Sequence, residues 1–106
     1  MARILAIVSD LMLASRVQES LRAAGHEVSV ASSIPDPVEA EAIVCDLDAV
    51  DPREAANAAI PVLGFYSHVD VATRRAAEAA GIDRVVPRSR MSRELPELVE
   101  QLLSEG

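Results

Sequence analysis

Short apolar runs recur along the chain and are separated by polar turns or by longer stretches with helical spacing. The first run is continuous, whereas the second alternates apolar and polar residues. Runs of this length that are bounded by turn residues predict β-strands. The five predicted strands are Arg3–Val8, Glu27–Ala31, Ala42–Asp46, Pro61–Tyr66 and Arg84–Val86.

Three stretches between or after these runs predict helices. Residues 11–24 place apolar side chains at helical spacing, with Ser9 or Asp10 suited to cap the first turn and Gly25 to end the helix. Residues 71–80 are rich in alanine and end at Gly81. The last helix has an apolar stripe, and Pro96 must lie in its first turn because proline deeper in a helix removes a hydrogen bond.

The two central connections are short. Asp36-Pro37 and Asp51-Pro52 each place a capping residue before a proline that suits the first helical position. We therefore expect a helix of about one or two turns between Pro37 and Glu41, and a somewhat longer one from Pro52 to Ala59.

Strands that alternate with helices in this way predict an α/β fold with a doubly wound parallel sheet, right-handed crossovers and three layers. The expected strand order is the flavodoxin-like 2-1-3-4-5, with shortened second and third helices. At 106 residues and 50% hydrophobic content, the chain is expected to form one domain over residues 1–106.

Charge and composition exclude several functions. The net charge of -7 disfavours binding to nucleic acid or to an anionic membrane. A single cysteine, Cys45, and two scattered histidines give neither a disulfide nor a zinc motif, and there is no apolar stretch of the roughly 20 residues that a membrane span requires. We expect a cytoplasmic protein. All ten basic residues are arginine, so a lysine can have no role.

Two predicted strands end in carboxylates, Asp10 after the first and Asp46 at the end of the third. Ligands of open parallel sheets bind outside the carboxyl ends of the strands, where the strand order reverses. The two carboxylates are therefore expected to meet in one site.

Four segments that together span the chain resemble the receiver domain of two-component response regulators. Residues 4–10 resemble the first strand with its acidic pair, and residues 43–48 resemble the phosphoacceptor strand. Residues 61–67 and 80–88 resemble the fourth strand and the approach to the fifth-strand lysine. The resemblance implies a signalling module of receiver type with the same fold.

The resemblance assigns a role to each residue that matches the family's site. Asp46 falls on the phosphoacceptor, Asp10 on a Mg²⁺-binding carboxylate, and Asp48 on the residue that offers its main-chain carbonyl to the metal. Ser9 takes the place of the second acid of the pair. Mg²⁺ is thus the cofactor that the resemblance implies, with Asp10, Asp46 and Asp48 as ligands and Ser9 as an open case.

Three further positions depart from the family pattern. Arg88 stands where the family has its lysine, Tyr66 where it has a small hydroxyl residue, and Val85 where it has a switching aromatic residue. Arginine can contact a phosphoryl group in a bidentate manner, but with a different reach from lysine. The chain therefore resembles an atypical receiver, or pseudo-receiver.

Each candidate also has a structural explanation. Asp46 can simply end its strand, Asp10 can cap its helix, and Arg88 can be an ordinary surface arginine. Phe65 and Tyr66 fit a packing role. Of the remaining residues with reactive or charged side chains, Cys45 is expected to be buried, His26 and His68 to have no catalytic role, and Arg74-Arg75 to lie on a solvated helix face.

Three classes of function compete. The first is a signalling module, phosphorylated on Asp46, that acts through protein partners such as a histidine kinase or a downstream regulator. The second is a phosphorylation-independent pseudo-receiver that serves as a constitutive interaction or dimerisation domain. The third, a small flavodoxin-like enzyme or cofactor-binding domain, is disfavoured because no glycine-rich phosphate loop follows the first strand. We therefore expect no enzymatic activity.

Overall fold

The computed structural model describes residues 2–35, 37–67 and 71–105. Asp36 and His68, about which the sequence makes predictions, lie outside the described residues. The sheet contains five parallel strands in the order β2-β1-β3-β4-β5, as predicted. The strands are β1 (Arg3–Ile7), β2 (Glu27–Ala31), β3 (Ala42–Asp46), β4 (Val62–Tyr66) and β5 (Arg84–Pro87). All five predicted strands are confirmed to within one residue at each end.

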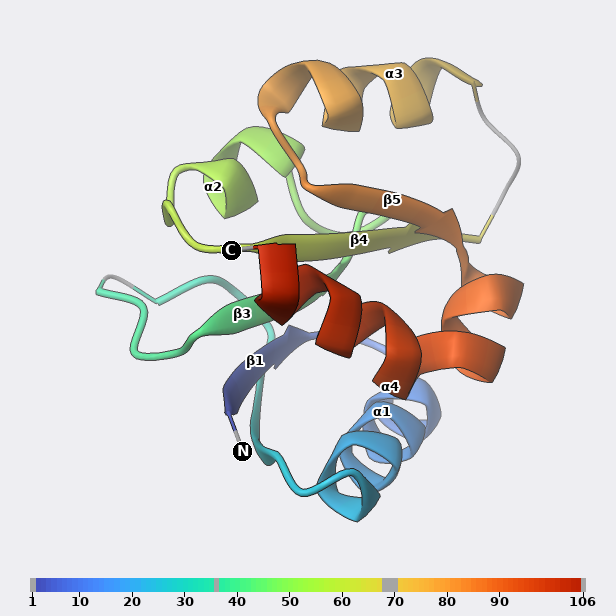
Figure 1. Ribbon diagram of the computed structural model, residues 1–106. Helices are drawn as coiled ribbons and strands as arrows, with labels where there is room; N and C mark the ends of the chain where they lie inside the picture. The colour runs from blue at the N-terminus through green and yellow to red at the C-terminus, as the bar shows by residue number, and fades with distance from the viewer. Residues whose placement is uncertain (1, 36, 68–70, 106) are drawn as a thin grey trace.

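Helices cover both faces of the sheet (Figure 1). One face carries α1 (Leu11–Ala23) and α4 (Arg88–Glu105), and the other carries α2 (Pro52–Ala56) and α3 (Val71–Ala80). Successive side chains of each strand point to opposite faces of the sheet, so the strands contribute to a hydrophobic core on each face. The core under α1 and α4 includes Ile4, Ala6, Val44 and Phe65, and the core on the opposite face includes Leu5, Ile7, Ile43 and Cys45. The two buried layers explain why the central strands are apolar at almost every position.

The helix ends follow their local chemistry. Asp10 caps α1 by accepting hydrogen bonds from the backbone N–H groups of Met12 and Leu13, and Asp51 caps α2 through the N–H of Arg53. Gly25 and Gly81 follow α1 and α3 with φ of +93° and +95°. Side chains rarely tolerate this conformation, so glycine is the suitable stop.

The helix expected between Pro37 and Glu41 is not formed, so that prediction is wrong. Residues 37–41 contain no helical turn, and the connection instead crosses the sheet as an irregular segment. Ile34, Val38 and Ala40 pack on the core beneath, so the segment covers the sheet without a helix.

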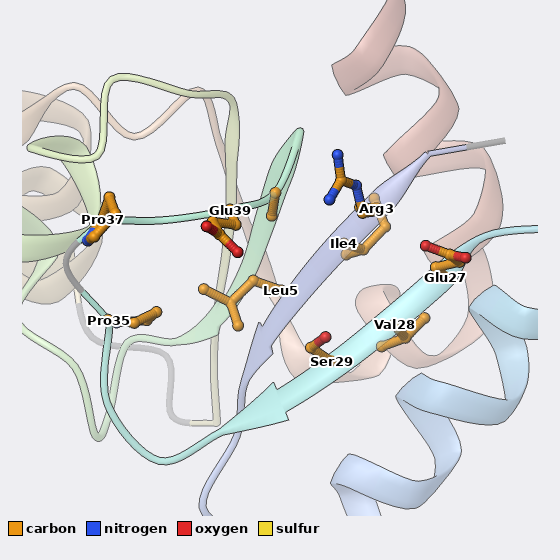
Figure 2. A pocket seen from close by; sticks show the side chains of 10 residues that line it. Arg3, Ile4, Leu5, Glu27, Val28, Ser29, Pro35, Pro37 and Glu39 are labelled. Atoms are coloured by element: carbon orange, nitrogen blue, oxygen red, sulfur yellow. The ribbon is translucent and has the colours of Figure 1, made fainter.

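A cavity of about 480 Å³ lies beside this irregular segment (Figure 2). Its walls come from the first residues of β1 and β2 and from the crossing segment. The lining residues include Arg3, Leu5, Glu27, Ser29, Pro35 and Glu39. None of the carboxylates predicted to form the site lines it.

The last helix begins earlier than its proline suggests. α4 starts at Arg88, but Glu94 has non-helical backbone angles (φ -121°, ψ 17°) where two helical segments meet at a kink. Pro96 lies just after this break, in the first turn of the second segment. The prediction for Pro96 therefore holds for that segment, and the preceding turns of helix were missed.

Candidate functional site

The candidate site lies at the carboxyl ends of β1, β3 and β5, where the chain leaves the sheet. β1 lies between β2 and β3 in the sheet, so the connections after β1 and β3 leave toward opposite faces and open a crevice between the two strand ends. Asp10 follows β1, Asp46 ends β3, and Arg88 follows β5 as the first residue of α4. Topology therefore gathers residues that are far apart in the sequence.

Asp46 points toward the face that carries α1 and α4. Val44 belongs to the core on that face, and alternation places Asp46 on the same side. Its Oδ1 accepts a hydrogen bond of 2.9 Å from the backbone N–H of Asp48. The side chain is half-buried, so the carboxylate is held by the loop yet still reaches solvent.

Asp10 and Arg88 form an ion pair beside Asp46. The Nη2 atom of Arg88 lies 3.6 Å from Oδ2 of Asp10, and both side chains remain close to half exposed. Hydrogen bonds from the backbone of Leu13 and Met12, together with Arg88, hold the pKa of Asp10 below its usual value. Asp10 therefore stays ionised and directs its second oxygen at the guanidinium.

Burial shifts the titration of Asp46 in the opposite direction. Desolvation raises the pKa of Asp46, and the negative charges of Asp48 and Asp10 add to this effect. The Asp48 N–H bond and the Arg88 charge oppose it only in part. Burial therefore favours the protonated form of Asp46 over the carboxylate.

Asp48 has a structural role that the sequence did not indicate. Its Oδ2 accepts a hydrogen bond of 2.9 Å from the backbone N–H of Ser67, which links the loop after β3 to the loop after β4. The resemblance predicts only a main-chain role for Asp48. The role of the Asp48 side chain could have been inferred from its place in the loop two residues after the strand end, because aspartates in loops often accept hydrogen bonds from backbone N–H groups.

Tyr66 lies apart from Asp10, Asp46 and Arg88. It ends β4 with a side chain only 7% exposed, as expected of a packing residue. Alternation from Val62 places it on the α2 and α3 face, away from Asp46. Phe65 and Cys45 are fully buried, which confirms their predicted packing roles.

Arg74 and Arg75 are exposed on α3, as predicted. The Nδ1 atom of His26 accepts a hydrogen bond from the backbone N–H of Ala2. Sequence reasoning missed Leu11 and Met12, which begin α1 next to Asp10 with 84% and 74% exposure. The exposure of Leu11 and Met12 could have been inferred from their position, because they precede Leu13, the first residue of the predicted apolar stripe.

The donor set fits Mg²⁺ poorly. Among the described residues, no group of three or more His, Cys, Asp or Glu side chains could hold a metal ion. One oxygen of Asp10 caps α1 and the other faces Arg88, while Ser9 supplies a hydroxyl where a carboxylate would be needed. Mg²⁺ keeps several of its waters and binds proteins through one or two carboxylates, and here both oxygens of Asp10 already contact α1 or Arg88.

No family model matches the chain, and no curated protein matches it by sequence. Solved structures of response-regulator receivers match its fold. A CheY-like receiver domain protein from Methanospirillum hungatei JF-1 gives a TM-score of 0.87 at 17% identity, over 99% of this chain and 95% of that one. Vibrio cholerae chemotaxis protein CheY4 gives 0.81 at 18% identity, over 97% and 99%. The non-phosphorylated HemR receiver domain from Leptospira biflexa gives 0.81 at 20%, over 98% and 95%.

These comparisons show the fold of the chain. It is the flavodoxin-like fold of CheY-like receiver domains, and the likeness extends over nearly the whole chain. Over the described part of the chain, no helix is both long and apolar enough to cross a membrane.

Proposed function

We propose that the protein is a receiver-type signalling module in which Asp46 is the phosphoacceptor and the output is a change in binding to a protein partner. The observation that carries this proposal is the convergence of Asp10, Asp46 and Arg88 at the carboxyl edge of the sheet. The receiver fold favours this function, but a fold alone does not establish a function, so the residues of the site must support it.

The chemistry required is a single phosphoryl transfer. A carboxylate oxygen of Asp46 attacks the phosphorus of an acyl phosphate or phosphohistidine donor, and the bond from phosphorus to the donor's leaving group breaks. The proposed role of Arg88 is to contact the transferred group, and it is supported by a guanidinium that is nearly half exposed and has donors beyond the one that faces Asp10. The product is an acyl phosphate on Asp46.

Hydrogen bonds in the loops after β3 and β4 connect Asp46 to the proposed output surface. Asp48 is joined to Asp46 through its N–H and to Ser67 through its carboxylate. A phosphoryl group on Asp46 adds negative charge within this chain of hydrogen bonds, which lowers the cost of displacing Asp48. α3 is the next element after Ser67 in the sequence, so the proposed output surface comprises β4, β5 and α3.

A protein is the partner that this surface suits. Leu11 and Met12 are large apolar side chains exposed beside the site, where a phosphodonor protein such as a histidine kinase would approach. Arg74 and Arg75 on α3 offer positive charge to a downstream regulator or to a second copy of this acidic chain. We propose no enzymatic turnover and a cytoplasmic location.

Intact mass after incubation with acetyl phosphate tests the proposal. The wild type should gain one phosphoryl group, Asp46→Asn should gain none, and Asp51→Asn should behave as the wild type because asparagine also caps a helix. Each reaction is run with Mg²⁺ and with EDTA. A folded wild type that gains nothing under both conditions would refute phosphorylation of Asp46 by this donor.

The second candidate is a pseudo-receiver that binds its partner constitutively. Ser9 in place of an acid and Tyr66 buried on the other face of the sheet favour it. In that case Asp46→Asn binds partners or self-associates as the wild type does. A partner affinity that changes only after phosphorylation of Asp46 would exclude this candidate.

A further inference from the structure

Arg88 places a positive charge beside the carboxylates of Asp10 and Asp46. Arg88 begins α4 directly after β5, so its backbone is fixed at the same edge of the sheet as the carboxylates. Its Nη2 lies 3.6 Å from Oδ2 of Asp10, and its charge also acts on Asp46. One guanidinium therefore neutralises part of the charge of both carboxylates.

The carboxylate oxygens near Asp46 are largely engaged within the chain. Oδ1 of Asp10 accepts from two backbone N–H groups, and Oδ1 of Asp46 accepts from Asp48. Oδ2 of Asp48 accepts from Ser67. A divalent ion bound to Asp10 would have to displace its contacts with α1 or with Arg88, and Ser9 offers no charge in compensation.

The charge of Arg88 also opposes a divalent ion. Asp10, Asp46 and Asp48 carry three negative charges when ionised, and Arg88 neutralises one of them. A divalent ion between the carboxylates would stand next to the guanidinium and be repelled by it. Arginine keeps its charge at any pH that the protein tolerates, so this repulsion is permanent.

We propose that Arg88 takes the place of the divalent cation, so that the Asp46 site works without bound Mg²⁺. Arg88 compensates the acidic cluster before modification and offers its remaining N–H donors to a phosphoryl oxygen afterwards. The inference builds on the phosphoacceptor role proposed for Asp46, but metal binding can be measured without any phosphoryl donor.

The test is thermal unfolding of the unphosphorylated protein in MgCl2, with NaCl of equal ionic strength as the reference. A site with a Kd of ~1 mM would raise Tm by at least about 4 °C at ~10 mM Mg²⁺. The wild type should show no shift beyond the NaCl reference. A shift of that size in the wild type, lost in Asp46→Asn, would overturn the proposal.

The converse experiment creates the missing metal site. The double variant Ser9→Asp, Arg88→Ala restores the second carboxylate and removes the internal cation, so its Tm should rise with Mg²⁺. Arg88→Ala alone serves if the double variant does not fold. Arg74→Ala is the matched control, because it removes an exposed arginine that is paired with Glu78 on α3. No Mg²⁺ response in the folded Arg88 variants would also overturn the proposal.

Phosphorylation provides an independent readout. If the wild type is phosphorylated, the amount of phosphoprotein should be the same in EDTA and in Mg²⁺, and Arg88→Ala should lose the EDTA reaction. Labelling that requires Mg²⁺ would refute the role of Arg88 while leaving Asp46 as the acceptor. No labelling under either condition would refute the phosphoacceptor role, and the metal titration would still decide the cation.

Discussion

Gly64 in the middle of β4 is the position where one added methyl group should have the clearest effect. A Cβ at Gly64 would lie 2.8 Å from Cδ1, 2.9 Å from Cγ and 3.0 Å from Cδ2 of Leu47. Carbon atoms pack best at about 3.5–4.0 Å, so all three contacts overlap. Leu47 is only 7% exposed and cannot simply swing into solvent.

The expected cost of Gly64→Ala follows from this overlap. Added methyl groups in a well-packed core destabilise by about 1–3 kcal/mol. For a domain of this size, each kcal/mol lowers Tm by about 4 °C or more. Leu47 lies between Asp46 and Asp48, so its displacement should also disturb the loop that holds the candidate phosphoacceptor.

A double-mutant cycle followed by urea unfolding tests the cause. Leu47→Ala should itself cost about 2–5 kcal/mol because it empties a buried site. In that background Gly64→Ala should be neutral or stabilising, because alanine is favoured over glycine in a strand by about 0.5–1 kcal/mol. If Gly64→Ala costs the same in both backgrounds, the clash with Leu47 is not the reason for the glycine.

Three further outcomes are expected. The pKa of Asp46 is raised in the folded chain, so ionised Asp46 opposes folding, and the free energy of unfolding falls as the pH rises above the usual carboxyl pKa of 3.8. Asp46→Asn should therefore raise Tm at pH 7, and this gain should vanish below pH 3.8. Asp10 has a lowered pKa, so Asp10→Asn should show the opposite pattern, and equal pH profiles for the two variants would contradict both assignments. Burial raises the pKa of the Cys45 thiol to about 12, so iodoacetamide at pH 8 should leave the native protein unlabelled and label it in urea, as read by mass; rapid native labelling would contradict this burial. Asp51→Ala removes the cap of α2 and should cost ~1 kcal/mol in urea unfolding, whereas Asp51→Ser should retain most of the stability; an equal loss in both would exclude the capping role.

The elements that the sequence predicted best are those with local causes. Apolar runs bounded by turn residues located all five strands, and Asp10, Gly25 and Gly81 marked helix ends because capping and positive φ depend on adjacent residues. The same reasoning failed between Pro37 and Glu41. There, the packing of Ile34, Val38 and Ala40 on the sheet outweighed the helix-start signal of Asp36-Pro37.

The site was predictable as a set of residues but not as an arrangement. Parallel topology implied that Asp10 and Asp46 would meet, and the resemblance supplied Arg88. No sequence pattern indicated that Arg88 would pair with Asp10, that Asp48 would hold Ser67, or that the added Cβ at Gly64 would strike Leu47.

The sequence by itself therefore determined the order and type of the strands, the two-sided burial of the sheet and the identity of the acidic residues. These follow from residue spacing, which acts over a few positions of the chain. The tertiary structure alone decided that Asp48 accepts from Ser67 and that Asp10 faces Arg88. These two contacts join residues about 20 to 80 positions apart, and only the packed sheet fixes their distances.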